Sequence, residues 1–239
     1  TTSLEKKRGA LRLLRQFEGA AGHPIYLLED AAYRELGFRG QAPPSALASR
    51  GAASRVLYAG TYSKPFATGV RVGFGLLPEP VRTAVLRIKG NHDFGTSNLP
   101  QHLLAAALES GIYDRHLDVL HRRYARKAQI MQHALAQEFP PQAEWRPPAG
   151  GLYFWARLPG RIGTGVASRL FKAAVAHDVL YVPGQLCYAP DPARRRPDHE
   201  MRLSFGAASE HEIREGITRL GSVLQQELDS RDSRAAKRA

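Results

Sequence analysis

Apolar positions in the first part of the chain recur at helical spacing in one segment and run together in others. Residues 4–17 follow Ser3, a good N-cap, and carry apolar side chains on one helical face, so a helix is predicted that ends near Gly19 or Gly22. Short apolar runs bounded by turn residues indicate buried strands at 24–28, 56–59 and 70–77. Two more helices are predicted at 80–89 and 99–109.

The second part of the chain opens with a long amphipathic pattern. Between residues 113 and 139 one apolar stripe predicts a single helix, formed by Leu117, Leu120, Tyr124, Ala128, Met131 and Leu135. Pro140-Pro141 ends this helix. Shorter patterns follow, with strands predicted at 152–158, 179–182 and 201–205 and helices at 166–177 and 210–228. Such a succession is typical of a smaller α+β unit.

Helix–strand alternation in the first part predicts an α/β fold with a mixed, mostly parallel sheet. We expect a large domain over 1–112, a small C-terminal domain over 113–229 that includes the long helix, and a basic tail over 230–239. In α/β sheets, ligands gather beyond the carboxyl ends of the strands. Asp30 and Lys64 both fall at such ends, so they are the first candidate site residues.

Composition narrows the class of protein. With 239 residues, 43% of them hydrophobic, the chain can build one large domain or two modest ones. No apolar run reaches the roughly 18–20 residues that a membrane span needs, and no signal-peptide pattern opens the chain. The single Cys187 excludes an internal disulfide framework, so the cytoplasm is the expected location. The nine histidines are scattered without metal-ligand spacing, so no metal site is predicted.

The net charge of +12 raises the question of an anionic partner. The arginines are dispersed along the chain and are not interleaved with aromatic residues as in a nucleic-acid interface. A solvated basic surface is the preferred explanation. A phosphate-bearing cofactor or an attached DNA-binding module stays open as an alternative.

Lys64 stands in an unusual local setting. It follows the apolar run Val56–Ala59 and lies in a tight turn among glycines, hydroxyls and apolar residues, with Arg71 seven residues later. A lysine amine that loses hydration in such a turn can act as a nucleophile toward a carbonyl. The alternative is an ordinary surface lysine in a loop.

Pyridoxal 5′-phosphate is a cofactor whose needs these residues match. It requires a lysine for a Schiff base, an acid opposite the pyridine nitrogen and donors for a phosphate dianion. Lys64 supplies the first, Asp30 the second, and Tyr33 could donate to the phenolic oxygen. The phosphate donors would be Thr61, Ser63 and Arg71. Taken alone, each residue has a structural alternative, because such an aspartate is often a helix cap and such a tyrosine often belongs to the core.

The assembled pattern resembles fold-type I pyridoxal-phosphate enzymes, in particular the class I/II aminotransferases. The likeness is to the aminoadipate/kynurenine aminotransferase branch and to the aminotransferase-like domain of MocR/GntR-type regulators. It is carried by an Asp-x-x-Tyr motif at Asp30–Tyr33 and a Gly-Ser/Thr-x-Ser-Lys…Gly-x-Arg motif at Gly60–Arg71. Further matching blocks cover almost the whole chain in one order, at 108–117, 148–154, 183–184 and 201–205.

This resemblance implies an aminotransferase that moves an amino group between an amino acid and a 2-oxo acid through a Lys64 Schiff base. In the segment Met201–Phe205 apolar and polar residues alternate, so one strand face presents Arg202. The resemblance implies that Arg202 binds the substrate α-carboxylate, and it also implies a homodimer. A different class of function stays open, in which the chain is the effector-sensing domain of a MocR/GntR-type transcriptional regulator and binds DNA only through a separate winged-helix module.

The resembled enzymes carry a further segment, which ends in an Asn-Pro-x-Gly motif, before the position that matches Thr1-Thr2-Ser3-Leu4. The chain therefore resembles roughly the C-terminal three-fifths of such a protein. Residues 1–112 would be the remainder of its cofactor-binding large domain.

Overall fold

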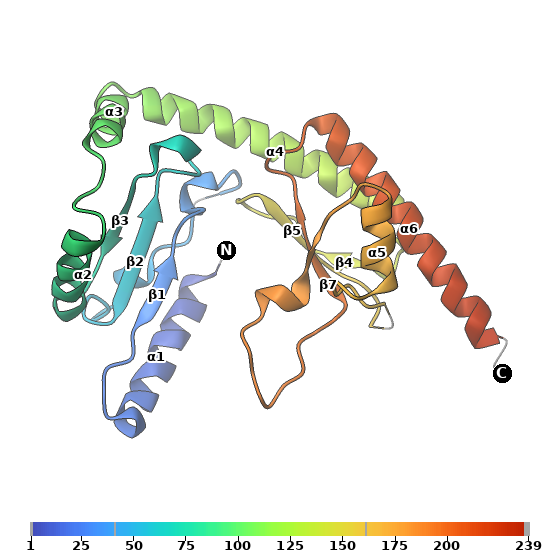
Figure 1. Ribbon diagram of the computed structural model, residues 1–239, viewed down its shortest axis with the longest axis horizontal. Coiled ribbons are helices and arrows are strands. Elements are labelled where there is room, and N and C mark those ends of the chain that lie inside the picture. The colour runs from blue at the N-terminus through green and yellow to red at the C-terminus, as the bar shows by residue number, and fades with distance from the viewer. Residues whose placement is uncertain (1, 41, 161, 237–239) are drawn as a thin grey trace. The chain divides into compact units, whose positions relative to one another are not determined.

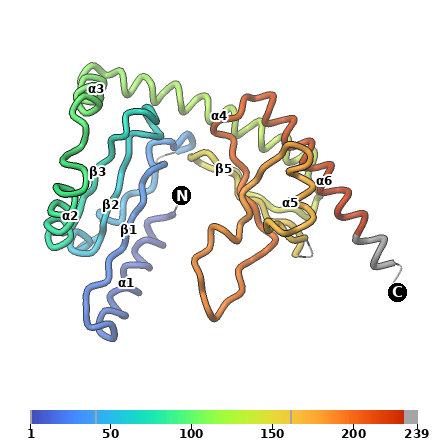
Figure 2. The backbone as a smooth tube through the Cα atoms, in the orientation of Figure 1, coloured from blue at the N-terminus to red at the C-terminus, as the bar shows by residue number. Residues whose placement is uncertain are grey.

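The computed structural model describes residues 2–40, 42–160 and 162–236. Contacts between residues divide the chain into two compact units, one reaching to Arg122 and the other starting at Arg123. The division falls inside the long helix α4 (Ile112–Glu138), which Figures 1 and 2 show as one continuous element.

The first unit is built on a mixed three-stranded sheet in the order β1-β2-β3. β1 (Leu27–Asp30) pairs in parallel with β2 (Val56–Thr61), and β2 pairs antiparallel with β3 (Gly73–Leu76). The register sets Asp30 opposite Ala59, so the two parallel strands end beside each other. This arrangement confirms the predicted α/β class with a mixed sheet.

Helix α1 (Leu4–Ala21) packs against one end of this sheet through a small apolar core. Ser3 caps the helix, since its hydroxyl accepts a hydrogen bond from the Lys6 backbone N–H at 3.3 Å, and Gly22 ends it in the left-handed conformation at φ 67°. Both ends were predicted from the sequence. The core cluster comprises Leu11, Ala46, Ala52 and Val56, with Leu27 and Leu47 packed against it.

Glu29 connects three segments of the first unit. Its carboxylate pairs with Lys7 of α1 at 2.5 Å and accepts hydrogen bonds from the Ser45 hydroxyl at 2.7 Å and the Ala46 backbone N–H at 2.8 Å. Only 12% of the Glu29 side chain and 13% of the Lys7 side chain are exposed. Burial alone would raise the pKa of Glu29, but these three partners together lower it below its ordinary value.

Replacing Glu29 with glutamine should therefore lower the free energy of unfolding by about 1–2 kcal/mol at pH 7, because Lys7 would lose its charged partner in a largely buried place. The wild-type contribution is complete above the ordinary glutamate pKa of 4.5 and is lost as the pH falls through the lowered value. Urea unfolding of wild type and variant at pH 7 measures the loss of stability, and the same experiment at pH 4 measures how much of the Glu29 contribution disappears in acid. Glu5→Gln, an exposed position on α1, is the matched control. Equal effects of the two substitutions would contradict the prediction.

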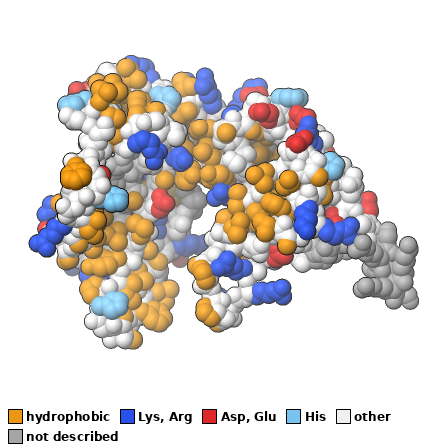
Figure 3. All heavy atoms as spheres, in the orientation of Figure 1, with side chains coloured by type: hydrophobic (Ala, Val, Ile, Leu, Met, Phe, Trp, Pro, Cys, Tyr) orange, Lys and Arg blue, Asp and Glu red, His pale blue; other side chains and the backbone are white. Residues whose placement is uncertain are grey.

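Three helices follow the first sheet: α2 (Glu79–His92), α3 (Asn98–Glu109) and α4. All three were predicted, with bounds that differ by at most a few residues. No described residue of α2 is buried, and all four residues of β3 are exposed. Figure 3 shows hydrophobic side chains at the surface in this part of the molecule, and the exposed ones include Phe74, Leu76, Leu86, Ile88, Phe94, Leu99 and Leu103.

The second unit holds an antiparallel sheet in the order β4-β5-β7-β6. Its central strands are β5 (Tyr153–Arg157) and β7 (Glu200–Ser204), and its edges are β4 (Glu144–Trp145) and β6 (Val182–Pro183). β4 was not predicted from the sequence. Helices α5 (Arg169–Ala176) and α6 (Glu210–Ala236) accompany the sheet, and the core is formed around Phe154, Met201, Phe205, Leu220 and Leu224.

Several predicted bounds in the second unit were wrong, each for a local reason. α5 begins at Arg169 and not at 166, because the Ser168 hydroxyl caps it by accepting from the Phe171 backbone N–H at 3.1 Å.

Residues 179–181 do not form the predicted strand, because the chain ends α5 in a special turn there. The Asp178 backbone is left-handed (φ 59°), and the Val179 N–H donates back to the Ala174 carbonyl at 2.9 Å. This pairing is a Schellman-type helix ending with aspartate in the usual place of glycine. α6 runs past 228 to Ala236, since no glycine or proline stops it.

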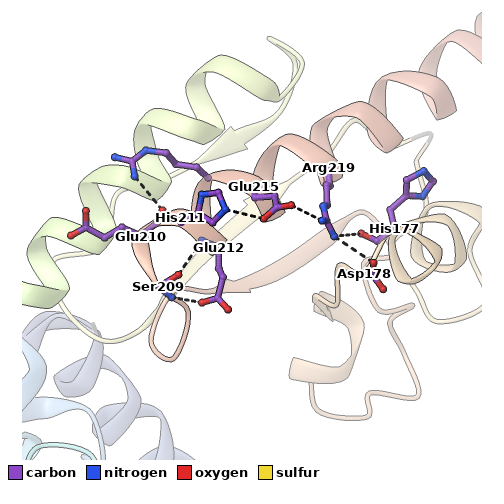
Figure 4. A network of polar contacts seen from close by, with 9 residues as sticks. His177, Asp178, Ser209, Glu210, His211, Glu212, Glu215 and Arg219 are labelled. Atoms are coloured by element: carbon purple, nitrogen blue, oxygen red, sulfur yellow. Dashed lines mark hydrogen bonds and ion pairs between the residues drawn. The ribbon is translucent and has the colours of Figure 1, made fainter.

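A polar network surrounds the start of α6 (Figure 4). Ser209 and Glu212 form a reciprocal capping box, with the Ser209 N–H donating to the Glu212 carboxylate at 2.6 Å and the Glu212 N–H donating to the Ser209 hydroxyl at 3.2 Å. Arg219 pairs with Glu215 at 2.5 Å and with Asp178 at 3.5 Å. Asp178, Glu212, Glu215 and Arg219 are the charged side chains that line an open cavity of about 380 Å³. Each of them already has a polar partner in this network, so the cavity is not a candidate site.

Within the part of the chain that the structure describes, no helix combines the length and the apolar character that a membrane crossing requires.

Candidate active site

The candidate site lies at the carboxyl ends of β1 and β2. The parallel ladder continues past the end of β1, where the Ala31 N–H donates to the Ala59 carbonyl at 2.8 Å. Asp30 is exposed there, and its carboxylate accepts from the Ala32 N–H at 3.1 Å, which closes a short turn after the strand. A carboxylate is thus presented at the end of β1, one strand away from the turn that carries Lys64.

The turn after β2 presents Lys64. The Thr61 hydroxyl accepts from the Ser63 N–H at 3.1 Å, and the Tyr62 carbonyl accepts from the Phe66 N–H at 3.0 Å. These bonds close a tight turn with Lys64 inside it. Lys64 forms no hydrogen bond or ion pair with the residues that the structure describes, and its side chain is exposed. Among the described residues the Lys64 amine is therefore solvent-exposed, while Pro65 beside it is buried and the Phe66 ring lies against Tyr113 and His116. The loss of hydration expected for Lys64 stays a prediction.

Arg71 returns to the same turn from the start of the next strand. Its guanidinium donates to the Ser63 hydroxyl at 3.2 Å and to the Thr68 carbonyl at 3.3 Å. The Arg71 backbone is left-handed at φ 51°, which is uncommon for a residue other than glycine. Such a conformation costs on the order of 1 kcal/mol, and non-glycine residues of this kind cluster at functional sites. The structure thus brings Thr61, Ser63, Lys64 and Arg71 together around one turn.

Tyr33 lies in the short segment that follows Asp30. It precedes the 3-10 helix Arg34–Leu36, and 36% of its surface is exposed, so it is not a core tyrosine. Its carbonyl accepts from the Leu36 N–H at 3.1 Å. Tyr33 thus lies three residues past the end of β1, in the segment that joins Asp30 to the 3-10 helix.

Aromatic contacts that were not predicted from the sequence support the Lys64 turn. The Phe66 ring lies 5.9 Å from the rings of Tyr113 and His116 on α4, and Tyr62 lies 5.8 Å from Tyr113. Burial raises the pKa of Tyr113 to about 12. These contacts join positions some fifty residues apart, so only the aromatic content of the two segments could have indicated them.

Gly60, at the end of β2, allows another aromatic side chain to approach the backbone. A Cβ atom built at Gly60 would lie 2.5 Å from the Phe74 ring, far inside contact distance. Phe74 in turn lies 5.8 Å from Tyr62 and 6.1 Å from Tyr58. Gly60 thus lets the Phe74 ring lie directly over the strand that leads to Lys64, and a larger residue there would displace this half-exposed ring.

Arg202 belongs to the second unit, where it lies on β7 opposite Trp155 of β5 and Val182 of β6. Its guanidinium carbon lies 4.4 Å from the centroid of the Tyr153 ring. The core-facing neighbours Met201 and Leu203 are buried, so Arg202 stands on the other face of the sheet, as the alternation predicted.

The residues of the first unit fit a phosphate-bearing pyridine aldehyde. A phosphate dianion needs several donors in one place, and the Arg71 guanidinium already lies within 3.2 Å of the Ser63 hydroxyl, beside Thr61. A pyridinium nitrogen needs a carboxylate, which Asp30 presents on the adjacent parallel strand. An aldehyde needs an accessible amine, and Lys64 is exposed within the same turn.

Comparison with protein families matches residues 12–220 to the model described as aminotransferase class I and II. The chain belongs to this family. The aromatic-amino-acid aminotransferase 1 of Thermococcus litoralis is 33% identical over 91% of the chain and 50% of its own length. An uncharacterized HTH-type transcriptional regulator of Bacillus subtilis, YisV, is 32% identical over 80% of the chain and 37% of its length.

Solved structures give the same assignment. The α-aminoadipate aminotransferase LysN of Thermus thermophilus, complexed with N-(5′-phosphopyridoxyl)-L-leucine, matches with a TM-score of 0.76 and 32% identity. The match covers 91% of this chain and 54% of that one. The fold is therefore that of fold-type I pyridoxal-phosphate aminotransferases. The chain spans about half the length of the curated aminotransferases it matches.

Proposed function

We propose that the protein is a pyridoxal-phosphate-dependent aminotransferase that exchanges an amino group between an amino acid and a 2-oxo acid. The observation that carries this proposal is the turn after β2, where an exposed Lys64 lies beside the Arg71–Ser63 hydrogen bond and next to the strand that ends in Asp30. Family membership supports the reaction class.

In this proposal Arg71, Ser63 and Thr61 bind the cofactor phosphate, and Asp30 keeps a proton on the ring nitrogen. Tyr33 donates to the phenolic oxygen. When bound, the cofactor supplies an electron sink that stabilises negative charge at the substrate Cα. The amine of Lys64 would hold the cofactor between turnovers, and once free it would act as the base that accepts the proton of the substrate Cα and as the acid that gives it back.

Arg202 is proposed to bind the α-carboxylate of the substrate. A guanidinium fork matches a carboxylate in two parallel hydrogen bonds, which fixes the orientation of the bound carboxylate group. The proposal also includes a homodimer and a cytoplasmic location. The homodimer rests on the resemblance described above, and the location on the single cysteine.

An absorbance spectrum tests the proposal. The intact protein mixed with pyridoxal phosphate should develop a visible band that shifts when an amino acid is added, and a panel of amino acids with a 2-oxo acid acceptor should identify a substrate. A protein that binds no cofactor, or that reacts with none of the panel, would overturn the aminotransferase proposal.

A second candidate is the effector-sensing domain of a MocR/GntR-type transcriptional regulator, favoured by the likeness to YisV. The same Lys64 chemistry would then detect a cofactor or amine without turnover. Sequencing the gene upstream of Thr1 distinguishes the two: a winged helix-turn-helix module supports the regulator. In that case, a gel-shift assay with the promoter region should change on addition of pyridoxal phosphate.

A further inference from the structure

The outer face of the second sheet carries an arginine in an aromatic setting. Along β5, Phe154 and Ala156 face the core, so Tyr153 and Trp155 lie on the opposite face. Along β7, Arg202 lies on this same outer face and directly opposite Trp155. Tyr153 pairs with Ser204 in the register, so it is the diagonal neighbour of Arg202 on one sheet face.

The Arg202 guanidinium is held by a ring and not by an acid. Its carbon lies 4.4 Å from the Tyr153 centroid, well within the range of a cation–π contact. Among the described residues it forms no ion pair with a carboxylate, and its buried Nε atom has no hydrogen-bond partner. A buried donor without a partner is rare in folded proteins and asks for an explanation.

We propose that Tyr153 is a positioning residue for Arg202, and that stacking on its ring fixes the plane of the guanidinium while leaving the hydrogen-bonding fork for a carboxylate. The inference rests on the proposed function and deepens it, because it names what sets the geometry of the carboxylate contact. A protein carboxylate beside Arg202 would compete with a substrate carboxylate for the same donors. An aromatic face orients the cation without using any of them.

This arrangement has a consequence for selectivity. A substrate gains affinity from the oriented fork only through its carboxylate, so an amine without that group gains no affinity from it.

Tyr153→Leu keeps an apolar side chain on the strand but removes the ring face. We expect it to raise KM for the amino acid about 10-fold. The rate with the decarboxylated amine should change by less than about 2-fold. Tyr153→Phe keeps the ring and should behave as wild type.

The experiment uses the intact protein loaded with pyridoxal phosphate and the best amino acid from the panel. For leucine, the amine probe is 3-methylbutylamine, and the binding probe without an amine is 4-methylpentanoate. Calorimetric titration of this acid measures the affinity for a carboxylate in the absence of turnover. The same titration of Arg202→Lys shows how much affinity is lost when the guanidinium fork itself is removed. Thermal unfolding of each variant verifies that the sheet is intact.

The outcomes separate the two proposals. Weaker binding of the acid by Tyr153→Leu but not by Tyr153→Phe supports the positioning role. A Tyr153→Leu protein that binds the acid as wild type does, or that loses the amine reaction equally, overturns this role and leaves the aminotransferase proposal standing. A wild-type protein that reacts with no amino acid of the panel overturns the proposed function and this inference with it.

Discussion

Replacing Lys64 with alanine is expected to lower turnover at least about 1,000-fold and to abolish the absorbance shift with pyridoxal phosphate. The reason is that a single amine serves as covalent anchor and as proton carrier in the proposed reaction, and positioned acid–base groups alone contribute roughly 10²–10⁴-fold. Steady-state kinetics with the panel substrate and a cofactor titration measure the two effects.

Lys64 is exposed and makes no contact with the described residues, so its removal should leave the free energy of unfolding within about 0.5 kcal/mol of wild type. Lys172→Ala, at an exposed position on α5, is the matched control and should retain full activity. A Lys64→Ala protein that still turns over at more than a tenth of the wild-type rate would assign the chemistry to another group.

Gly221→Ala is expected to destabilise the second unit by about 3 kcal/mol, the largest stability effect that we predict. A Cβ atom at this position of α6 would lie 2.6 Å from the backbone carbonyl oxygen of Glu138 and 2.8 Å from the Glu138 Cβ, at the end of α4. Backbone cannot rotate away as a side chain can, so the two helices would have to separate, with the cost of an overpacked core. Chemical denaturation measures the change.

The same helix contains a control substitution that should change stability in the opposite direction. A Cβ atom at Gly216 meets nothing within 4 Å, so Gly216→Ala should raise stability by roughly 0.5–1 kcal/mol through helix propensity alone. If both substitutions shifted the unfolding midpoint in the same direction, the close approach of Gly221 to α4 would not explain the effect of Gly221→Ala on stability.

The grouping of candidate site residues around one turn could be predicted because these residues lie close in sequence. Thr61, Ser63, Lys64 and Arg71 fall within eleven residues, and the strand that delivers them is a plain apolar run. Predicting that Asp30 lies near this turn required one more inference, namely that the carboxyl ends of adjacent parallel strands lie at the same edge of a sheet. The register of β1 with β2 agrees with that step.

Features that depend on distant residues could not be predicted. The packing of Phe66 on Tyr113 joins segments with no shared local pattern, and the contact between Tyr153 and Arg202 depends on strand register. The left-handed backbone of Arg71 and Asp178 also escaped prediction, because glycine is the residue that usually signals this conformation. The proposed roles of the site residues and the domain limits at 112 and 229 stay predictions.

The edges of the second sheet bear on how the protein behaves at high concentration. β4 and β6 are each two residues long, Pro183 removes a backbone donor from β6, and Pro147-Pro148 follow β4 closely. A short edge that lacks donors is a poor template for a strand from another molecule, and natural sheets use such edges against fibrillar aggregation. The first sheet has no proline in its edge strands, and β3 is apolar and exposed. Aggregation, where it occurs, should therefore begin at β3 and leave the sheet that carries Arg202 intact.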